Sequence, residues 1–193
     1  GKRPDGFHEL ETVMHHVPIY DVLQFQQATV GIQLSCDNPA LPTDASNVVY
    51  RAAAKFLEEA KIRDGVRIHL AKRIPLAAGL GGGSGNAATT LRGLNQLFGS
   101  PLTSKQLFEI AAALGSDVPF FLQDQPGLAT GRGEVVESLP SFRTLEGVHI
   151  LLVHPGFGVS TPWAYRNLAR FPKDFNGERE RAPVRGRQGS EHR

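Results

Sequence analysis

One glycine-rich stretch of this 193-residue chain has the composition of a ligand-binding loop. PLAAGLGGGSGNAATTL, residues 75–91, holds five of the 21 glycines. A turn needs one or two glycines, so a longer run indicates backbone that contacts something. An Ala-, Thr- and Leu-rich segment behind it predicts a helix over about residues 85–98. The first turn of a helix has unpaired N–H groups and partial positive charge, which suits a phosphate. Ser84 and Asn86 can add contacts to phosphate oxygens or to a metal ion.

Several interpretations of this stretch compete. A Walker A loop requires a lysine directly after its glycines, and none follows here. A Rossmann loop fits Gly83, Gly85 and Ala88, but the acidic residue expected about 20 residues later is Glu109, which falls inside a predicted helix. A glycine-rich turn that only packs against its helix stays open as the structural alternative.

The stretch also resembles the ATP loop of the GHMP kinases, P-x-x-x-G-L-G-[GS]-[GS]-[SG]. Five other segments, in order, resemble one family among them, the 4-diphosphocytidyl-2-C-methyl-D-erythritol kinases. These segments, which cover about residues 1–170, are GKRPDGFHELETVMHHVPIYD, NVVYRAAAKF, LGSDVPFFL, ATGRGEVVESL and HPGFGVSTPWAY. The resemblance implies an α+β protein of the GHMP kinase fold, with an N-terminal domain like ribosomal protein S5 domain 2 and the start of a C-terminal α/β domain.

The resemblance further implies a kinase (a transferase) that uses ATP and Mg²⁺. Its expected reaction is phosphorylation of the 2-hydroxyl of 4-diphosphocytidyl-2-C-methyl-D-erythritol, in non-mevalonate isoprenoid (terpenoid) precursor synthesis. Another GHMP small-molecule kinase and an inactive nucleotide-binding remnant stay open as alternatives. The residues that the resemblance assigns to ATP are Pro75, Leu76, Ala77, Ala78, Gly79, Leu80, Gly81, Gly82, Gly83, Ser84, Gly85 and Asn86.

Five residues receive catalytic or substrate roles from the resemblance, and each has a plainer interpretation. Asp117 is the expected catalytic base, or else an acid that favours a helix start. His8 and Phe7 are expected to hold the cytosine base, although a lone histidine is usually structural. Tyr165 is expected to stack on the base or to fill an apolar helix face, and Thr161 to contact substrate or cap that helix.

Alternation of apolar and polar residues predicts the strands that position these side chains. Strands of a mostly antiparallel sheet are expected in ELETVMHHV, DVLQFQQ and VGIQLSC, and another strand in GVRIHLAKRI leads into the glycine loop. Short strands are expected in PGLATGRGEVVESL, and a hydrophobic strand in GVHILLVHP, residues 147–155.

Apolar residues at helical spacing predict the helices. NVVYRAAAKFLEEAKI is the clearest, with Ser46 or Asn47 as its cap. TSKQLFEIAAALGS predicts a second, with a capping box from Thr103 to Gln106 and a stop at Gly115. A last helix is expected over about residues 161–170.

Composition excludes several functional classes. The formal net charge is +2, which offers no basic field for nucleic acid, and no apolar run approaches the length of a membrane span. The single cysteine excludes a disulfide framework and favours a cytoplasmic protein. The histidines lack metal-ligand spacing, so we expect no metal held by the protein alone. A small-molecule substrate is the expected partner, with a monomer or weak homodimer as the assembly.

The resemblance also sets the expected domains. Residues 1–138 are the expected ATP-binding domain, 139–175 the start of the C-terminal domain, and 176–193 a disordered tail rich in Arg, Glu, Gly and Pro. The family has a lysine-bearing strand before the GKRPDG segment and about a hundred residues after the HPG segment. Neither is in this sequence, so we expect impaired kinase activity from the chain as it stands.

Overall fold

A computed structural model describes residues 10–160, 163–164 and 167 of the chain. The chain divides into two units, Gly1–Phe157 and Gly158–Arg193, and every element named below lies in the first unit. In chain order the elements are β1 (Leu10–Met14), β2 (Val22–Ala28), β3 (Ile32–Cys36), α1 (Val48–Glu59), β4 (Gly65–Ala71), α2 (Gly82–Leu97), α3 (Ser104–Leu114), the 3₁₀-helix η1 (Pro119–Leu122), β5 (Gly127–Gly131), β6 (Val135–Ser138) and the 3₁₀-helix η2 (Arg143–Leu145).

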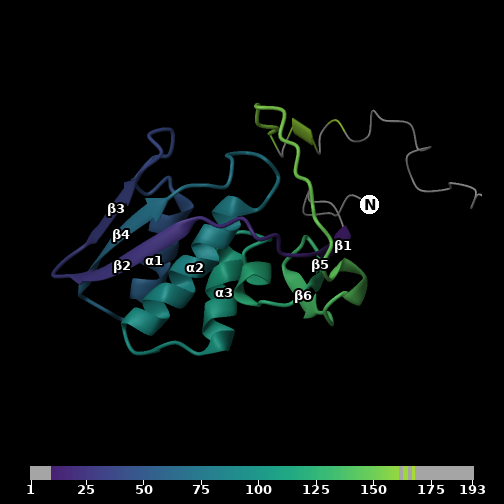
Figure 1. Ribbon diagram of the computed structural model, residues 1–193. Coiled ribbons are helices and arrows are strands. Elements are labelled where there is room, and N and C mark those ends of the chain that lie inside the picture. The colour runs from purple at the N-terminus through teal and green to yellow at the C-terminus, as the bar shows by residue number, and fades with distance from the viewer. Residues whose placement is uncertain (1–9, 161–162, 165–166, 168–193) are drawn as a thin grey trace, which may run out of the picture. The chain divides into compact units, whose positions relative to one another are not determined.

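The first sheet has the strand order β2-β4-β3, with α1 and α2 packed on one face (Figure 1). β4 pairs antiparallel with β2 and parallel with β3. The parallel pair qualifies the expectation of a mostly antiparallel sheet, because α1 connects β3 to β4 as a crossover helix. The alternation in GVRIHL correctly predicts the inner face of β4, where Val66, Ile68 and Leu70 are buried.

α1 and α3 form as their sequences predict. The apolar stripe of α1 is buried at Val49, Ala52, Ala53 and Phe56. Its cap is Asn47, whose side-chain oxygen accepts a hydrogen bond from the backbone N–H of Val49 at 2.9 Å. The start of α3 has the expected capping box, in which the side chains of residues 103 and 106 each accept from the other's backbone N–H.

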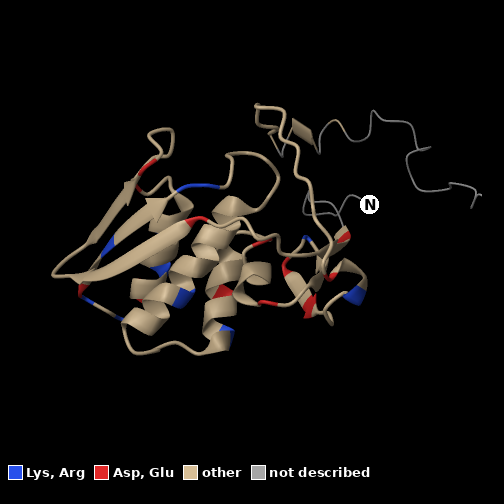
Figure 2. Ribbon diagram, in the orientation of Figure 1, with Lys and Arg blue, Asp and Glu red and all other residues tan. Residues whose placement is uncertain are grey.

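The second sheet, of order β1-β5-β6, is antiparallel throughout. The strands expected in ELETVM and in GLATGRGEVVES form here, and β1 pairs with β5 from Leu10↔Gly131 to Met14↔Gly127. The segment of residues 15–21 then leads from β1 in this sheet to β2 in the other. Positively and negatively charged residues are interspersed along the ribbon rather than gathered in one region (Figure 2).

Two local predictions are confirmed with adjustments, and one is wrong. The helix expected over about residues 85–98 forms as α2 but begins at Gly82. α3 ends at Leu114 with Gly115 as its C-cap residue, as expected, although φ of Gly115 is 174°, extended backbone that does not require glycine. Residues 147–155 form no strand: Leu151 is 86% exposed and Val153 83% exposed, and no strand among the described residues pairs with them.

Candidate functional site

A cavity of about 410 Å³ brings the glycine loop and the expected base to one space. The loop and the start of α2 form one wall, the segment joining β1 to β2 forms another, and η1 closes a third side. Six of the twelve residues expected to bind ATP line it, namely Gly79, Leu80, Gly81, Gly82, Gly85 and Asn86. Pro75, Leu76, Ala77, Ala78, Gly83 and Ser84 do not line this cavity.

The loop delivers an uncapped helix start to the cavity. Positive φ angles at Ala77 (53°), Gly79 (72°) and Gly81 (65°) turn the chain from β4 into α2. Gly81 is the N-cap residue of α2, and no side chain caps the helix. The first intrahelical bond runs from Gly85 N to Gly81 O at 2.8 Å. The N–H groups of residues 82–84 therefore have no intrahelical acceptor, which is the geometry that binds an anion.

Phe121 of η1 gives two of the loop glycines a packing role. A Cβ at Gly81 would lie 2.6 Å from Phe121 Cζ, and one at Gly85 would lie 3.4 Å from Phe121 Cδ1. The ring therefore occupies the space that side chains would fill on the start of α2. The glycines of this loop thus have two effects: they leave the start of α2 open, and they allow η1 to pack closely against it.

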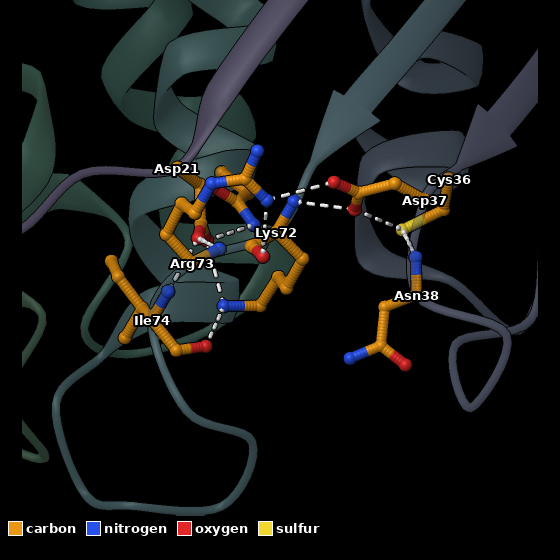
Figure 3. A network of polar contacts seen from close by, with 8 residues as sticks. Asp21, Cys36, Asp37, Asn38, Lys72, Arg73 and Ile74 are labelled. Carbon is orange, nitrogen blue, oxygen red and sulfur yellow. Dashed lines mark hydrogen bonds and ion pairs between the residues drawn. The ribbon is translucent and has the colours of Figure 1, made fainter.

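An ion pair that the sequence analysis did not anticipate lies at the base of the loop (Figure 3). Lys72 Nζ contacts Asp21 Oδ2 at 2.8 Å, and the two side chains are 4% and 1% exposed. The ammonium also donates to the carbonyl of Ile74, and it lies 3.3 Å from where a Cβ on Gly82 would stand. A lysine is thus fixed behind the start of α2, with its charge balanced by Asp21, although no lysine follows the glycines.

The Asp21 carboxylate accepts three further hydrogen bonds. Oδ1 accepts from the backbone N–H of Arg73 at 2.6 Å and of Ile74 at 2.8 Å. Oδ2 accepts from Asn86 Nδ2 at 2.9 Å. Burial alone would raise the pKa of Asp21, but the hydrogen bonds from Lys72, from these two N–H groups and from Asn86 outweigh it and lower the pKa. Asp21 therefore stays ionised at neutral pH.

Asn86 lies where the loop prediction places it, but its amide has another partner. The residue is 5% exposed, and its NH₂ group donates to Asp21 rather than pointing freely into the cavity. Its backbone carbonyl accepts from Thr90 Oγ1 at 2.7 Å. The side chain therefore ties α2 to the strand side of the loop.

Asp117, the expected catalytic base, lines the same cavity as the glycine loop. It belongs to the turn between α3 and η1, is exposed, and lines the cavity with Gly81 and Gly85. The expected placement at a helix start is wrong, because Val118 is the N-cap residue and η1 is a 3₁₀-helix of four residues. Among the described residues no hydrogen-bond or ion-pair partner holds its carboxylate, which leaves the oxygens open to the cavity.

Aromatic rings also line the cavity near η1. The His16 ring stacks on Phe120 at 4.5 Å between centroids, with 14° between the planes, and meets the edge of Phe121 at 5.8 Å. His16 Nε2 lies 3.1 Å from the carbonyl oxygen of Gln123, so this nitrogen carries the proton. The packing of these rings fixes η1, and with it the turn that carries Asp117.

All four expected substrate residues lie outside the described residues; they are Phe7, His8, Thr161 and Tyr165. Within the described part of the chain, His, Cys, Asp and Glu side chains form no group of three that could hold a metal ion. None of the helices described there is long and apolar enough to cross a membrane.

The family model of the GHMP kinases N terminal domain matches residues 47–125, from the cap of α1 to just beyond η1. Among curated proteins, 4-diphosphocytidyl-2-C-methyl-D-erythritol kinase of Synechococcus sp. (strain JA-2-3B'a(2-13)) is 49% identical over 86% of this chain and 53% of its own length. The same-named protein of Acetivibrio thermocellus is 42% identical over 87% of this chain and 58% of its own. The chain thus spans little more than half the length of these relatives.

Solved structures agree on the fold. A 4-(cytidine 5'-diphospho)-2C-methyl-D-erythritol kinase superposes with a TM-score of 0.67 at 38% identity, covering 86% of this chain and 57% of that one. Homoserine kinase from Cytophaga hutchinsonii superposes with a TM-score of 0.58 at 22% identity, covering 76% of this chain and 50% of that one. This likeness shows the fold alone. The expected α+β class with the GHMP kinase fold is confirmed.

Proposed function

This chain belongs to the GHMP kinases through its N-terminal domain, and on that premise we propose that its glycine loop binds the phosphates of ATP. One observation carries the proposal. The cavity is lined both by the uncapped start of α2, at Gly81, Gly82 and Gly85, and by Asp117. A donor cradle for phosphate beside an acceptor for a proton is what transfer of a phosphoryl group to an alcohol requires.

Asp117 is the proposed base that takes the proton from the acceptor hydroxyl. Its carboxylate is exposed on the cavity wall and held by no partner among the described residues, so its oxygens are open to a substrate. The backbone of residues 79–85 orients the phosphates, and the Lys72–Asp21 ion pair supports that backbone from behind. ATP supplies the phosphoryl group. Mg²⁺ commonly binds through phosphates and one or two carboxylates, which fits a site without a cage of protein ligands.

The proposed acceptor is the 2-hydroxyl of 4-diphosphocytidyl-2-C-methyl-D-erythritol, which makes the protein an enzyme of isoprenoid precursor synthesis. Curated relatives at 42% to 49% identity bear the name of that kinase. Phe7, His8, Thr161 and Tyr165 are the proposed substrate contacts. The wider proposal is a cytoplasmic protein, monomeric or weakly dimeric, that binds neither nucleic acid nor membranes. Its proposed domains are residues 1–138, 139–175 and a tail of 176–193.

A substrate panel tests the reaction. The chain is incubated with ATP, Mg²⁺ and one acceptor: the diphosphocytidyl substrate, homoserine or mevalonate. Mass spectrometry detects the phosphorylated product. Because impaired activity is expected of this chain, we expect a low yield of product, from the diphosphocytidyl substrate alone, and a still lower yield from the Asp117→Asn variant. Product from homoserine or mevalonate instead would assign a different GHMP kinase activity.

Calorimetry separates the second candidate, a nucleotide-binding remnant. The buried support beneath the loop does not involve Asp117, so ATP can bind even where transfer fails. Binding of ATP without product from any acceptor would favour the remnant. A chain that binds no ATP would contradict both candidates.

A further inference from the structure

We infer that Asp21 is a positioning residue that holds the glycine loop in its anion-binding shape by joining the two ends of the loop. The inference rests on the proposed ATP site and concerns a residue outside the loop itself. Asp21 directly precedes β2, far from the glycines in the sequence, and reaches the loop only through the fold.

The contacts of the carboxylate divide between the two ends of the loop. Oδ1 accepts the backbone N–H groups of Arg73 and Ile74, which enter the loop from β4. Oδ2 accepts the amide of Asn86, which leaves the loop on the second turn of α2. One side chain thus bridges the entry and the exit of residues 75–85.

The ammonium of Lys72 strengthens the bridge and extends it toward the helix start. It pairs with Oδ2 and donates to the Ile74 carbonyl, so it too belongs to the entry side. The carboxylate is almost fully buried, and charge-assisted hydrogen bonds are strongest where water cannot compete. A loop with three positive φ angles among its residues needs such an anchor, because its glycines restrain the backbone little.

Asp37 offers a natural control at the same end of β4. Its carboxylate accepts the backbone N–H of Lys72 at 2.7 Å and the guanidinium of Arg73 at 2.8 Å. Both of these partners lie on the entry side, and the Arg73 side chain is 63% exposed. Asp37 therefore resembles Asp21 in chemistry and neighbourhood but does not join the two ends of the glycine loop.

Asp21→Asn tests the inference directly. An asparagine keeps one accepting oxygen but turns an NH₂ group toward donors, so one end of the loop is released whichever way the amide faces. Hydrogen–deuterium exchange then reports on the hydrogen-bonded amides at the two ends of the loop, those of Arg73, Ile74 and Gly85, with α1 as the internal reference. We expect at least about tenfold faster exchange at these loop amides, the scale of one lost charge-assisted hydrogen bond, and no change in α1.

Two more variants complete the design. Asp37→Asn should leave loop exchange within about twofold of the unaltered chain, because an exposed pair contributes little. Asn86→Ala cuts only the exit side and keeps the buried ion pair, so it should accelerate loop exchange even if Asp21→Asn fails to fold. Unchanged loop exchange, or equal acceleration in the loop and in α1, would overturn the inference.

Nucleotide affinity separates this inference from the proposed function. By calorimetry, Asp21→Asn should weaken ATP binding about tenfold and leave adenosine binding unchanged, since adenosine lacks the phosphates that the loop would hold. If the unaltered chain binds no ATP, the proposed function fails, while the exchange measurement still decides whether Asp21 positions the loop. Equal weakening of ATP and adenosine would overturn the specific role in phosphate binding.

Discussion

The two walls of the cavity hold their functional groups by opposite means. On the loop wall, Asp21 and Lys72 are almost fully buried, and every oxygen of the carboxylate has a partner. On the wall formed by η1, Asp117 is exposed, and the turn that carries it is held by the packing of aromatic rings and by backbone hydrogen bonds such as Val118 N to Gly115 O at 3.2 Å. The wall expected to bind phosphate therefore rests on buried groups whose oxygens all have partners. The group expected to react is instead exposed.

The difference has a physical reason. A phosphate cradle works only if its N–H groups already point inward, so the protein must fix its shape before the ligand arrives. A base, by contrast, must present unpartnered oxygens to a substrate proton. The buried ion pair also places its charge behind the backbone, where it stabilises geometry without blocking the cavity.

The largest expected effect concerns the reacting wall alone. Asp117→Asn should slow phosphoryl transfer by about 10²–10⁴-fold, the usual contribution of a general base, with ATP affinity unchanged. Single-turnover kinetics and calorimetry measure the two quantities. Asp124→Asn is the control, because this exposed carboxylate lines the same cavity but pairs with Arg92. Equal losses in both variants would remove the distinction between Asp117 and a general surface charge.

Substitutions in the loop wall should lower the stability of the fold. Lys72→Met leaves the Asp21 carboxylate buried without its counter-ion, so the free energy of unfolding should fall by about 3–5 kcal/mol. Urea denaturation measures the change. Arg73→Gln removes the cation of the neighbouring exposed pair and should change stability little. A similar small effect from both substitutions would show that burial gives the inner pair no special weight.

The variant Gly81→Ala tests the contact between the glycine loop and η1. The new Cβ would stand 2.6 Å from Phe121 Cζ on backbone with φ 65°, so the ring or the helix start must shift. We expect ATP affinity to fall about 10- to 100-fold, the loss of one hydrogen bond to a charged group. Gly81→Ala combined with Phe121→Leu relieves the contact but keeps the strain. Recovery of affinity in the double variant would assign the loss to the ring.

The smallest expected effect is the acid dependence of stability. Because the folded pKa of Asp21 lies below its ordinary value of about 3.9, its contribution is complete above that pH and is lost as the pH falls through the folded pKa. Asp21→Asn should weaken the pH dependence of the free energy of unfolding below about pH 4. The pKa of exposed Asp37 is also lowered, by the Lys72 N–H and Arg73, but about 1 M salt should screen that pair far more. An unchanged acid slope in Asp21→Asn would contradict the buried role.

Local patterns predicted most of the elements. The apolar stripe of α1, the capping box of α3 and the alternation of β4 all involve residues close in sequence, and all three predictions are confirmed. The strand at residues 147–155 was predicted by the same kind of pattern, yet a strand also needs a partner. Nothing within the segment itself says whether a partner exists.

The residues of the candidate site also fall into two groups: those that local sequence predicts and those that only the fold brings together. Glycines clustered before a helix predict an anion site because the unpaired N–H groups of a helix start are a local property. The sequence by itself therefore determined the loop and the helix behind it, and the resemblance adds the prediction that Asp117 is a catalytic base. The Asp21–Lys72 pair and the Phe121 contact were decided only by the tertiary structure. They join segments distant along the chain, and buried charges find partners only where the fold brings their strands and helices together.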